Sequence, residues 1–125
     1  MSEQHKAILE EGNAAIDEGN YEGFLSFCTD DTLWTFVGDR TLEGKEAVRQ
    51  WMAAEYVEPP RNTVTNLIAE GDFLTAIGEI VLKDKDGKAT TSSYCDIWRF
   101  HGGKIAELRA FVIETELEDK TNNAA

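Results

Sequence analysis

The most informative stretch of the sequence is Tyr94-Cys95-Asp96-Ile97-Trp98-Arg99-Phe100. It lies in a longer run, residues 88–100, whose β-branched and aromatic residues are typical of a strand. Side chains alternate between the two faces of a strand. One face therefore carries Tyr94, Asp96, Trp98 and Phe100, and the other carries Cys95, Ile97 and Arg99. The pattern places a single carboxyl group in the middle of an aromatic face.

The segments around this stretch predict an antiparallel meander. Strand-like runs occupy residues 63–69, 73–82, 88–100 and 104–113. The connections at residues 70–72, 84–87 and 101–103 are rich in Gly and Asp and have the length of hairpin turns. We therefore expect four consecutive strands, each paired with the next.

The preceding half of the chain predicts helices and one further strand. Apolar periodicity indicates helices at residues 3–18, 21–27 and 45–55, and residues 32–37 indicate a strand. Helices gathered before a long antiparallel sheet predict an α+β fold. We expect the sheet to curl into a cone whose concave face is covered by the helices, as in a cystatin-like α+β barrel. The mouth of such a cone is a natural pocket for a small molecule.

Length and charge set the limits on function. The 125 residues predict a single domain, residues 1–125, with a frayed tail at 114–125. The 24 Asp and Glu against 12 Lys and Arg give a net charge of -12, which disfavours binding to nucleic acids or to anionic membranes. No apolar run is long enough to span a bilayer, and the polar start lacks a signal-peptide pattern, so we expect a cytoplasmic location.

Asp96 is the leading candidate for a functional residue. Apolar surroundings disfavour a carboxylate and raise its pKa, and such a group can donate a hydrogen bond or exchange a proton near neutral pH. The alternative is a structural Asp that is satisfied by a neighbouring hydroxyl or backbone amide. Both interpretations fit the sequence.

Glu79 is a second candidate carboxylate. It is the only charged residue between Phe73 and Leu82, and it shares a strand face with Thr75, Ile77 and Val81. If that face is concave, Glu79 lies in the same chamber as Asp96 and assists it. The alternative is a Glu at a sheet edge or an interface.

Aromatic residues on several segments are candidates for a binding pocket. Such residues could hold a flat, apolar ligand, although aromatic residues at these spacings also build ordinary cores. The candidates are Trp34, Phe36, Trp51, Tyr56, Tyr94 and Trp98.

Other chemistries have little support in the sequence. The two histidines, His5 and His101, and the two distant cysteines, Cys28 and Cys95, provide little material for a metal site, a disulfide framework or a catalytic triad. Phosphate-loop and dinucleotide-binding motifs are absent. We therefore expect neither a metal nor a cofactor.

From about residue 3 to residue 113, the sequence resembles the nuclear transport factor 2-like superfamily, which includes ketosteroid isomerase and the SnoaL-type polyketide cyclases. The segments that carry the resemblance are Phe27-Cys28-Thr29-Asp30-Asp31, Gly44-Lys45-Glu46-Ala47-Val48-Arg49, the stretch from Tyr94 to Phe100, Gly103-Lys104-Ile105 and Leu108-Arg109. The resemblance implies a cone-shaped α+β fold, a hydrophobic pocket and a homodimer formed through the outer face of the sheet. It also implies that Glu79 lies on the pocket side.

The resemblance to ketosteroid isomerase assigns one catalytic group. Asp96 matches the aspartic acid that donates a hydrogen bond to the oxyanion in that enzyme. The enzyme's proton-shuttling Asp falls on Phe36, its oxyanion Tyr near Gly12 and a supporting Tyr near Met52. The classical catalytic set is therefore not retained, and the fold alone does not specify the reaction.

Three functions follow as hypotheses. The first is a cofactor-independent isomerase, dehydratase, cyclase or hydrolase that acts on a small apolar substrate through Asp96. The second is a non-catalytic protein that binds a small ligand in the same pocket. The third is a dimeric interaction module. The sequence names neither the substrate nor the reaction.

Overall fold

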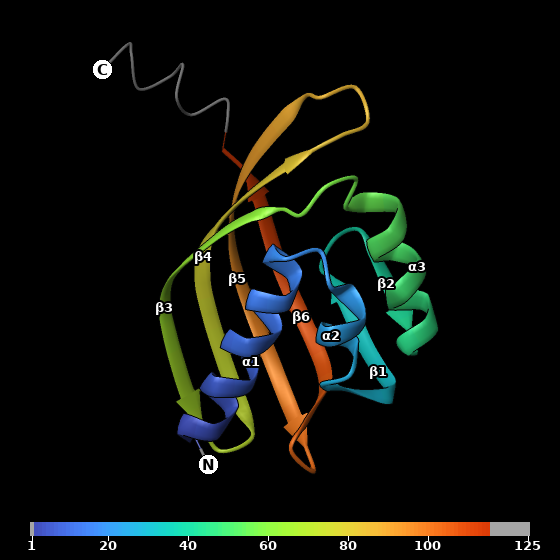
Figure 1. Cartoon of the computed structure of the whole chain (residues 1–125). Coiled ribbons are helices and arrows are strands. Elements are labelled where there is room, and N and C mark those ends of the chain that lie inside the picture. The colour runs from blue at the N-terminus through green and yellow to red at the C-terminus, as the bar shows by residue number, and fades with distance from the viewer. Residues whose placement is uncertain (1, 116–125) are drawn as a thin grey trace, which may run out of the picture.

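The computed structural model describes residues 2–115 of the chain. The described elements are α1 (Ser2–Asp17), α2 (Tyr21–Leu25), β1 (Cys28–Phe36), β2 (Arg40–Glu43), α3 (Lys45–Glu55), β3 (Arg61–Glu70), β4 (Phe73–Lys83), β5 (Ala89–His101) and β6 (Lys104–Glu114). The predicted α+β class is confirmed (Figure 1). No helix within residues 2–115 combines the length and the apolar character needed to cross a membrane.

The six strands form one curved sheet in the order β2-β1-β6-β5-β4-β3. β3 to β6 pair antiparallel with their neighbours along the chain, which confirms the predicted meander. β1 joins the meander by pairing parallel with β6, so the sheet is mixed. The sheet is curved but not closed into a barrel, and β2 and β3 are its two edges (Figure 1).

The helices cover one face of this sheet. α1 packs against β3 and β4, and α3 packs against β1 and β2 (Figure 1). The His5 ring of α1 stacks on Phe100 of β5 at 4.2 Å, which shows that Phe100 faces the helices. The core between the layers includes these buried residues of the sheet: Leu74, Ala76, Tyr94, Trp98, Phe100, Leu108 and Ala110.

Two segments differ from the sequence prediction. Residues 29–31, whose Thr-Asp-Asp sequence predicts a turn, belong to β1. They lie in an irregular part of this strand, between its pairing with β6 at Cys28 and at Leu33. The Thr32 hydroxyl, fully buried, donates to the Ile105 carbonyl at 3.2 Å and holds the two strands together there. β2 was not predicted, because four mostly exposed residues at a sheet edge have no apolar alternation to reveal them.

The expected tail at 114–125 lies mostly outside the described residues. Glu114 is the last residue of β6, and the backbone N–H of Thr115 donates to the Thr91 carbonyl at 2.9 Å. Residues 116–125 are not described.

Candidate functional site

A cavity of about 380 Å³ lies between the concave face of the sheet and the helices. This volume falls in the range of small-molecule sites, roughly 300–1,000 Å³. Its apolar lining includes Phe24, Trp34, Phe36, Trp51, Met52, Tyr56, Tyr94, Trp98, Leu108 and Ala110. The structure therefore brings all six aromatic residues predicted for binding to the wall of one cavity.

Strand pairing explains how the aromatic residues meet. Trp34 and Phe36 of β1 lie opposite Leu108 and Ala110 of β6 and so point to the same side of the sheet. From α3, the Trp51 ring approaches Phe36 at 4.9 Å between ring centroids. It also meets the Tyr56 ring at 5.2 Å. The wall of the cavity is thus a continuous set of aromatic rings contributed by a helix and the sheet.

Asp96 lies on the floor of this cavity, on the central strand β5. Its direct neighbours across the sheet are Ala76 on β4 and Ala110 on β6. Both neighbours have small side chains, and Asp96 itself lines the cavity. Its Oδ1 atom is buried and has no hydrogen-bond partner among the described residues. Burial away from water raises the pKa of Asp96 from 3.8 to about 7.

Tyr94 is held beside Asp96 by contacts with two other strands. Its hydroxyl donates to Asn62 Oδ1 of β3 at 2.5 Å. The ring reaches that far because it lies over Gly78 of β4, its direct partner across the sheet. A methyl group added at Gly78 would lie 2.7 Å from the Tyr94 hydroxyl and 2.3 Å from the Thr63 carbonyl. Burial raises the pKa of Tyr94 to about 12, and the nearby Asp96 adds to the rise.

Tyr56, the residue directly after α3, lines the cavity. Burial raises the pKa of its hydroxyl above the ordinary value of 10.0, and the charge of Asp96 contributes in the same direction. The electrostatic influence of Asp96 on both Tyr56 and Tyr94 shows that these three titratable groups share one apolar environment.

The expected placement of Glu79 beside Asp96 is wrong. Glu79 pairs with Ser93, whereas Asp96 pairs with Ala76, so the two carboxylates point to opposite faces of the sheet. Glu79 is exposed on the outer face, together with Ile77. The pocket side of β4 is formed by the other set of residues, of which Ile80 and Leu82 line the cavity.

The positions matched to the other catalytic groups of ketosteroid isomerase are apolar. Phe36 and Met52 both line the cavity. Gly12 on α1 packs against the edge of Phe24, and a Cβ at this position would lie 2.8 Å from that ring. The Phe24 ring therefore fills the space into which a side chain at residue 12 would project.

The charged rim of the cavity was not evident from the sequence. Asp17 at the end of α1, Asp39 after β1 and Glu114 at the end of β6 line it together with Asp96. Lys, Arg and His do not occur among the described residues that line it. The three rim residues come from segments far apart in the chain, so no local sequence pattern links them.

The sequence was compared with models of known protein families and with curated proteins. The family model described as the SnoaL-like domain matches residues 9–108. None of the curated proteins matches the sequence.

Solved structures with the same fold share little sequence with this chain. SalBIII, an epoxide hydrolase/cyclase-like enzyme of pyran ring formation in the polyether salinomycin, is 19% identical, with a TM-score of 0.82 and coverage of 90% of this chain and 94% of that one. An NTF2-like protein of unknown function from Burkholderia pseudomallei is 17% identical, with a TM-score of 0.78 and coverage of 94% and 95%. TerC, co-crystallised with polyporic acid, is 16% identical, with a TM-score of 0.75 and coverage of 94% and 96%.

These structural likenesses show the fold. The family model spans most of the chain, including α3, the aromatic wall and Asp96. The chain shares its fold with NTF2-like proteins and belongs to the SnoaL-like domain family.

Proposed function

We propose that the protein binds a small, ring-containing molecule in the aromatic cavity and that Asp96 exchanges a proton with it, without a cofactor. The reaction class is an isomerisation, dehydration, cyclisation or hydrolysis. The single observation that carries the proposal is the buried Oδ1 of Asp96, which has no hydrogen-bond partner among the described residues and lies on the cavity floor. A carboxyl group held in this way is free to bond to a ligand.

The chemistry of Asp96 suits proton exchange. General acids and bases work best when their pKa lies near the working pH, and the pKa of Asp96 is raised to about 7. Both protonation states are then populated at neutral pH. Tyr94 is less suited to this role because its hydroxyl is already bonded to Asn62.

Structural neighbours support a small-molecule function. SalBIII is described as an enzyme of pyran ring formation, and TerC was co-crystallised with polyporic acid. Both are less than 25% identical to this chain, so they support the class of function and do not name a substrate.

Hydrogen exchange of a bicyclic ketone tests the catalytic proposal. The protein is mixed with 2-tetralone in D2O, and loss of the α-proton signal is followed by NMR. We expect exchange that Asp96→Asn abolishes, because the amide cannot take up the proton. The matched control is Asp86→Asn, which makes the same change in the exposed β4–β5 turn. Exchange that is equal in wild type and Asp96→Asn would contradict a catalytic role.

Binding without catalysis is the second candidate. It is favoured by the apolar residues, Phe36 and Met52, at two positions matched to catalytic groups of ketosteroid isomerase. In that case 2-tetralone quenches the tryptophan fluorescence of the cavity, but its α-protons exchange at the uncatalysed rate.

We also propose that two copies associate through the outer face of the sheet. Exposed apolar residues gather on this face. Single exposed apolar residues are common on protein surfaces, but a contiguous patch of them indicates an interaction site. They are Ile68, Phe73, Ile77, Phe111 and Ile113. Sedimentation at micromolar concentration should give twice the chain mass of 14.0 kDa, and Phe111→Asp should reduce it to one chain. A wild-type mass of one chain would contradict the proposal.

A further inference from the structure

The charged residues around the cavity all have the same sign. Four carboxyl groups line it, those of Asp17, Asp39, Asp96 and Glu114, and no Lys, Arg or His is among the described lining residues. Asp39 forms an exposed ion pair with Arg40 at 3.6 Å, but Arg40 itself does not line the cavity. A negatively charged ligand would meet repulsion both at the rim and at the floor.

The aromatic wall adds a second attraction for positive charge. The faces of Trp, Tyr and Phe rings carry negative electrostatic potential and attract cations within about 6 Å of the ring centre. Trp51 lies 4.9 Å from Phe36, 5.2 Å from Tyr56 and 6.3 Å from Trp34 between ring centroids. These rings all line the cavity, so a cation bound there lies close to an aromatic wall.

Asp96 provides the counter-charge in the same space. It lines the cavity, and its direct neighbours across the sheet, Ala76 and Ala110, have small side chains. Its Oδ1 lacks any donor among the described residues. The other titratable side chains that line this space, apart from the rim carboxylates, are Tyr56 and Tyr94, and the Tyr94 hydroxyl already donates to Asn62. Uncharged polar groups also line it, and the Nε1 of Trp98 is buried without a hydrogen-bond partner among the described residues.

We propose that the ligand of this cavity carries a protonated amine on a flat apolar body, with the ammonium group bound by Asp96 and the surrounding aromatic rings. This inference rests on the proposed function, since it assigns the charge class of the molecule that enters the same cavity. The rim carboxylates of Asp17, Asp39 and Glu114 attract the cation to the mouth. Neutral ligands of the same shape bind more weakly, and anions are rejected.

The pH dependence of binding separates an ammonium ligand from a neutral one. An ammonium group prefers the ionised form of Asp96, and a primary alkylammonium stays protonated to above pH 8. The fraction of ionised Asp96 rises through its pKa of about 7. The affinity for an ammonium ligand therefore increases by about tenfold from pH 6 to pH 8. A neutral hydrogen-bond acceptor binds the protonated carboxyl group and shows the opposite trend.

Three naphthalene compounds of matched shape test the proposal by calorimetry and tryptophan fluorescence: 2-(aminomethyl)naphthalene, 2-naphthalenemethanol and 2-naphthoate. At pH 8 we expect the ammonium compound to bind about tenfold or more tightly than the alcohol, and the carboxylate to bind more weakly still. In Asp96→Asn, the preference for the ammonium compound falls to about threefold or less and its pH dependence disappears. Asp86→Asn is the matched control and should behave as wild type.

The outcomes distinguish this inference from the proposed function beneath it. Equal binding of the ammonium compound and the alcohol, or tightest binding of the carboxylate, would overturn the amine proposal and leave the small-molecule cavity standing. Failure of all three compounds to bind would overturn both. The pH trend of the wild-type protein needs no variant, so it remains decisive if Asp96→Asn folds poorly.

Discussion

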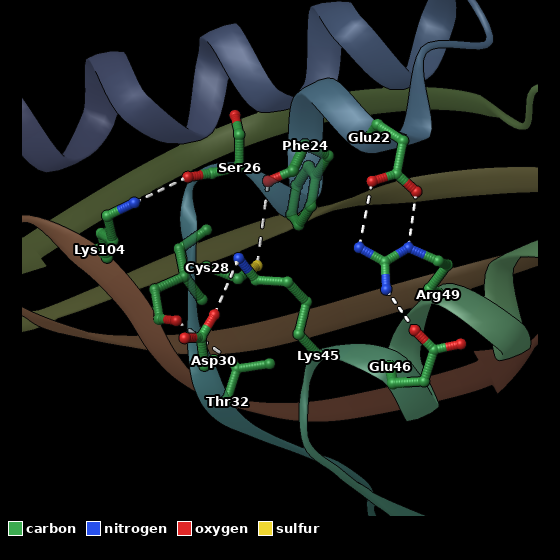
Figure 2. Close-up of polar contacts among 11 residues, drawn as sticks. Glu22, Phe24, Ser26, Cys28, Asp30, Thr32, Lys45, Glu46, Arg49 and Lys104 are labelled. Carbon is green, nitrogen blue, oxygen red and sulfur yellow. Dashed lines mark hydrogen bonds and ion pairs between the residues drawn. The ribbon is translucent and has the colours of Figure 1, made fainter.

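Glu22 on α2 and Asp96 on β5 are both carboxylates, and their surroundings shift their pKa values in opposite directions. The two oxygens of Glu22 accept hydrogen bonds from Arg49 Nε at 2.7 Å and Nη2 at 3.1 Å, and Arg49 also binds Glu46 (Figure 2). The hydrogen bond from Arg49 lowers the pKa of Glu22. Asp96 has no such partner, and burial raises its pKa to about 7.

The difference follows from where the basic residues are placed. Arg49 joins α2 to α3, Lys45 pairs with Asp30 at 3.4 Å, and Lys104 donates to the Ser26 carbonyl at 3.0 Å (Figure 2). Each of the three links two elements of the fold, and none lines the cavity. A carboxylate with a basic partner links elements of the fold, whereas one without a partner is available to a ligand.

The largest expected effect concerns the pH dependence of stability at Asp96. A tenfold change in proton affinity corresponds to about 1.4 kcal/mol, so a pKa raised from 3.8 to about 7 corresponds to roughly 4 kcal/mol. Asp96 binds its proton more tightly in the folded state than in the unfolded state. Its contribution to the free energy of unfolding is therefore fully present below pH 3.8 and is lost as the pH rises to about 7. In Asp96→Asn the loss should disappear. Urea unfolding of both proteins at pH 4 and pH 8 measures the difference.

The variant also loses a carboxylate, so the comparison needs a control with the same loss. Asp86→Asn removes an exposed carboxylate and should reproduce the wild-type pH dependence. Identical pH profiles for Asp96→Asn and wild type would show that Asp96 has an ordinary pKa and would remove the contrast with Glu22.

The next largest effect is expected at Gly78, which shapes the wall beside Asp96. In Gly78→Ala the new methyl group meets the Thr63 carbonyl and the Tyr94 hydroxyl, and backbone cannot move aside as easily as a side chain. Overpacking of this kind costs about 1–3 kcal/mol in the free energy of unfolding. Urea unfolding measures it, and naphthalenemethanol binding should weaken in parallel as Tyr94 shifts. A fully stable variant with unchanged binding would show that this wall adapts freely.

The alternation of side chains on β5 was enough to identify Asp96 from the sequence. A charged residue between Tyr94 and Trp98 stands out on an aromatic face, and all three residues line the cavity on the side of the sheet that the helices cover. The helices and the meander were equally accessible, because their apolar periodicity and their turns are local features.

The pairing of β4 with β5 was not evident from the sequence. The polarity of β4 itself was a signal, because Leu74, Ala76, Gly78, Ile80 and Leu82 form one set without polar side chains, whereas the other set carries Thr75 and Glu79. The hairpin register decides it, because Ala76 lies opposite Asp96 and thereby sends Glu79 outward. The acidic rim was hidden for a related reason, since Asp17, Asp39 and Glu114 meet only in the folded chain.

A smaller effect is expected for the hydroxyl of Tyr94. Tyr94→Phe keeps the ring over Gly78 but removes the hydrogen bond to Asn62. A single hydrogen bond of this type contributes about 1 kcal/mol, so the free energy of unfolding should fall by that amount. Because the ring remains, binding of naphthalenemethanol should be nearly unchanged. A large loss of binding would mean that the hydroxyl itself contacts the ligand.

The smallest effect is expected at the exposed pair of Glu22 and Arg49. Exposed ion pairs contribute little and are screened by salt, so Glu22→Gln should lower the melting temperature slightly at low salt and hardly at all in 1 M salt. The lowered pKa of Glu22 has the opposite sign from Asp96, so its contribution is present above pH 4.5 and is lost as the pH falls further. Thermal unfolding of wild type and Glu22→Gln at pH 7 and pH 3 measures this. A large decrease in melting temperature at pH 7 that salt does not reduce would contradict this expectation. It would mean that the surface ion pair, rather than the apolar packing behind it, holds α2 against α3.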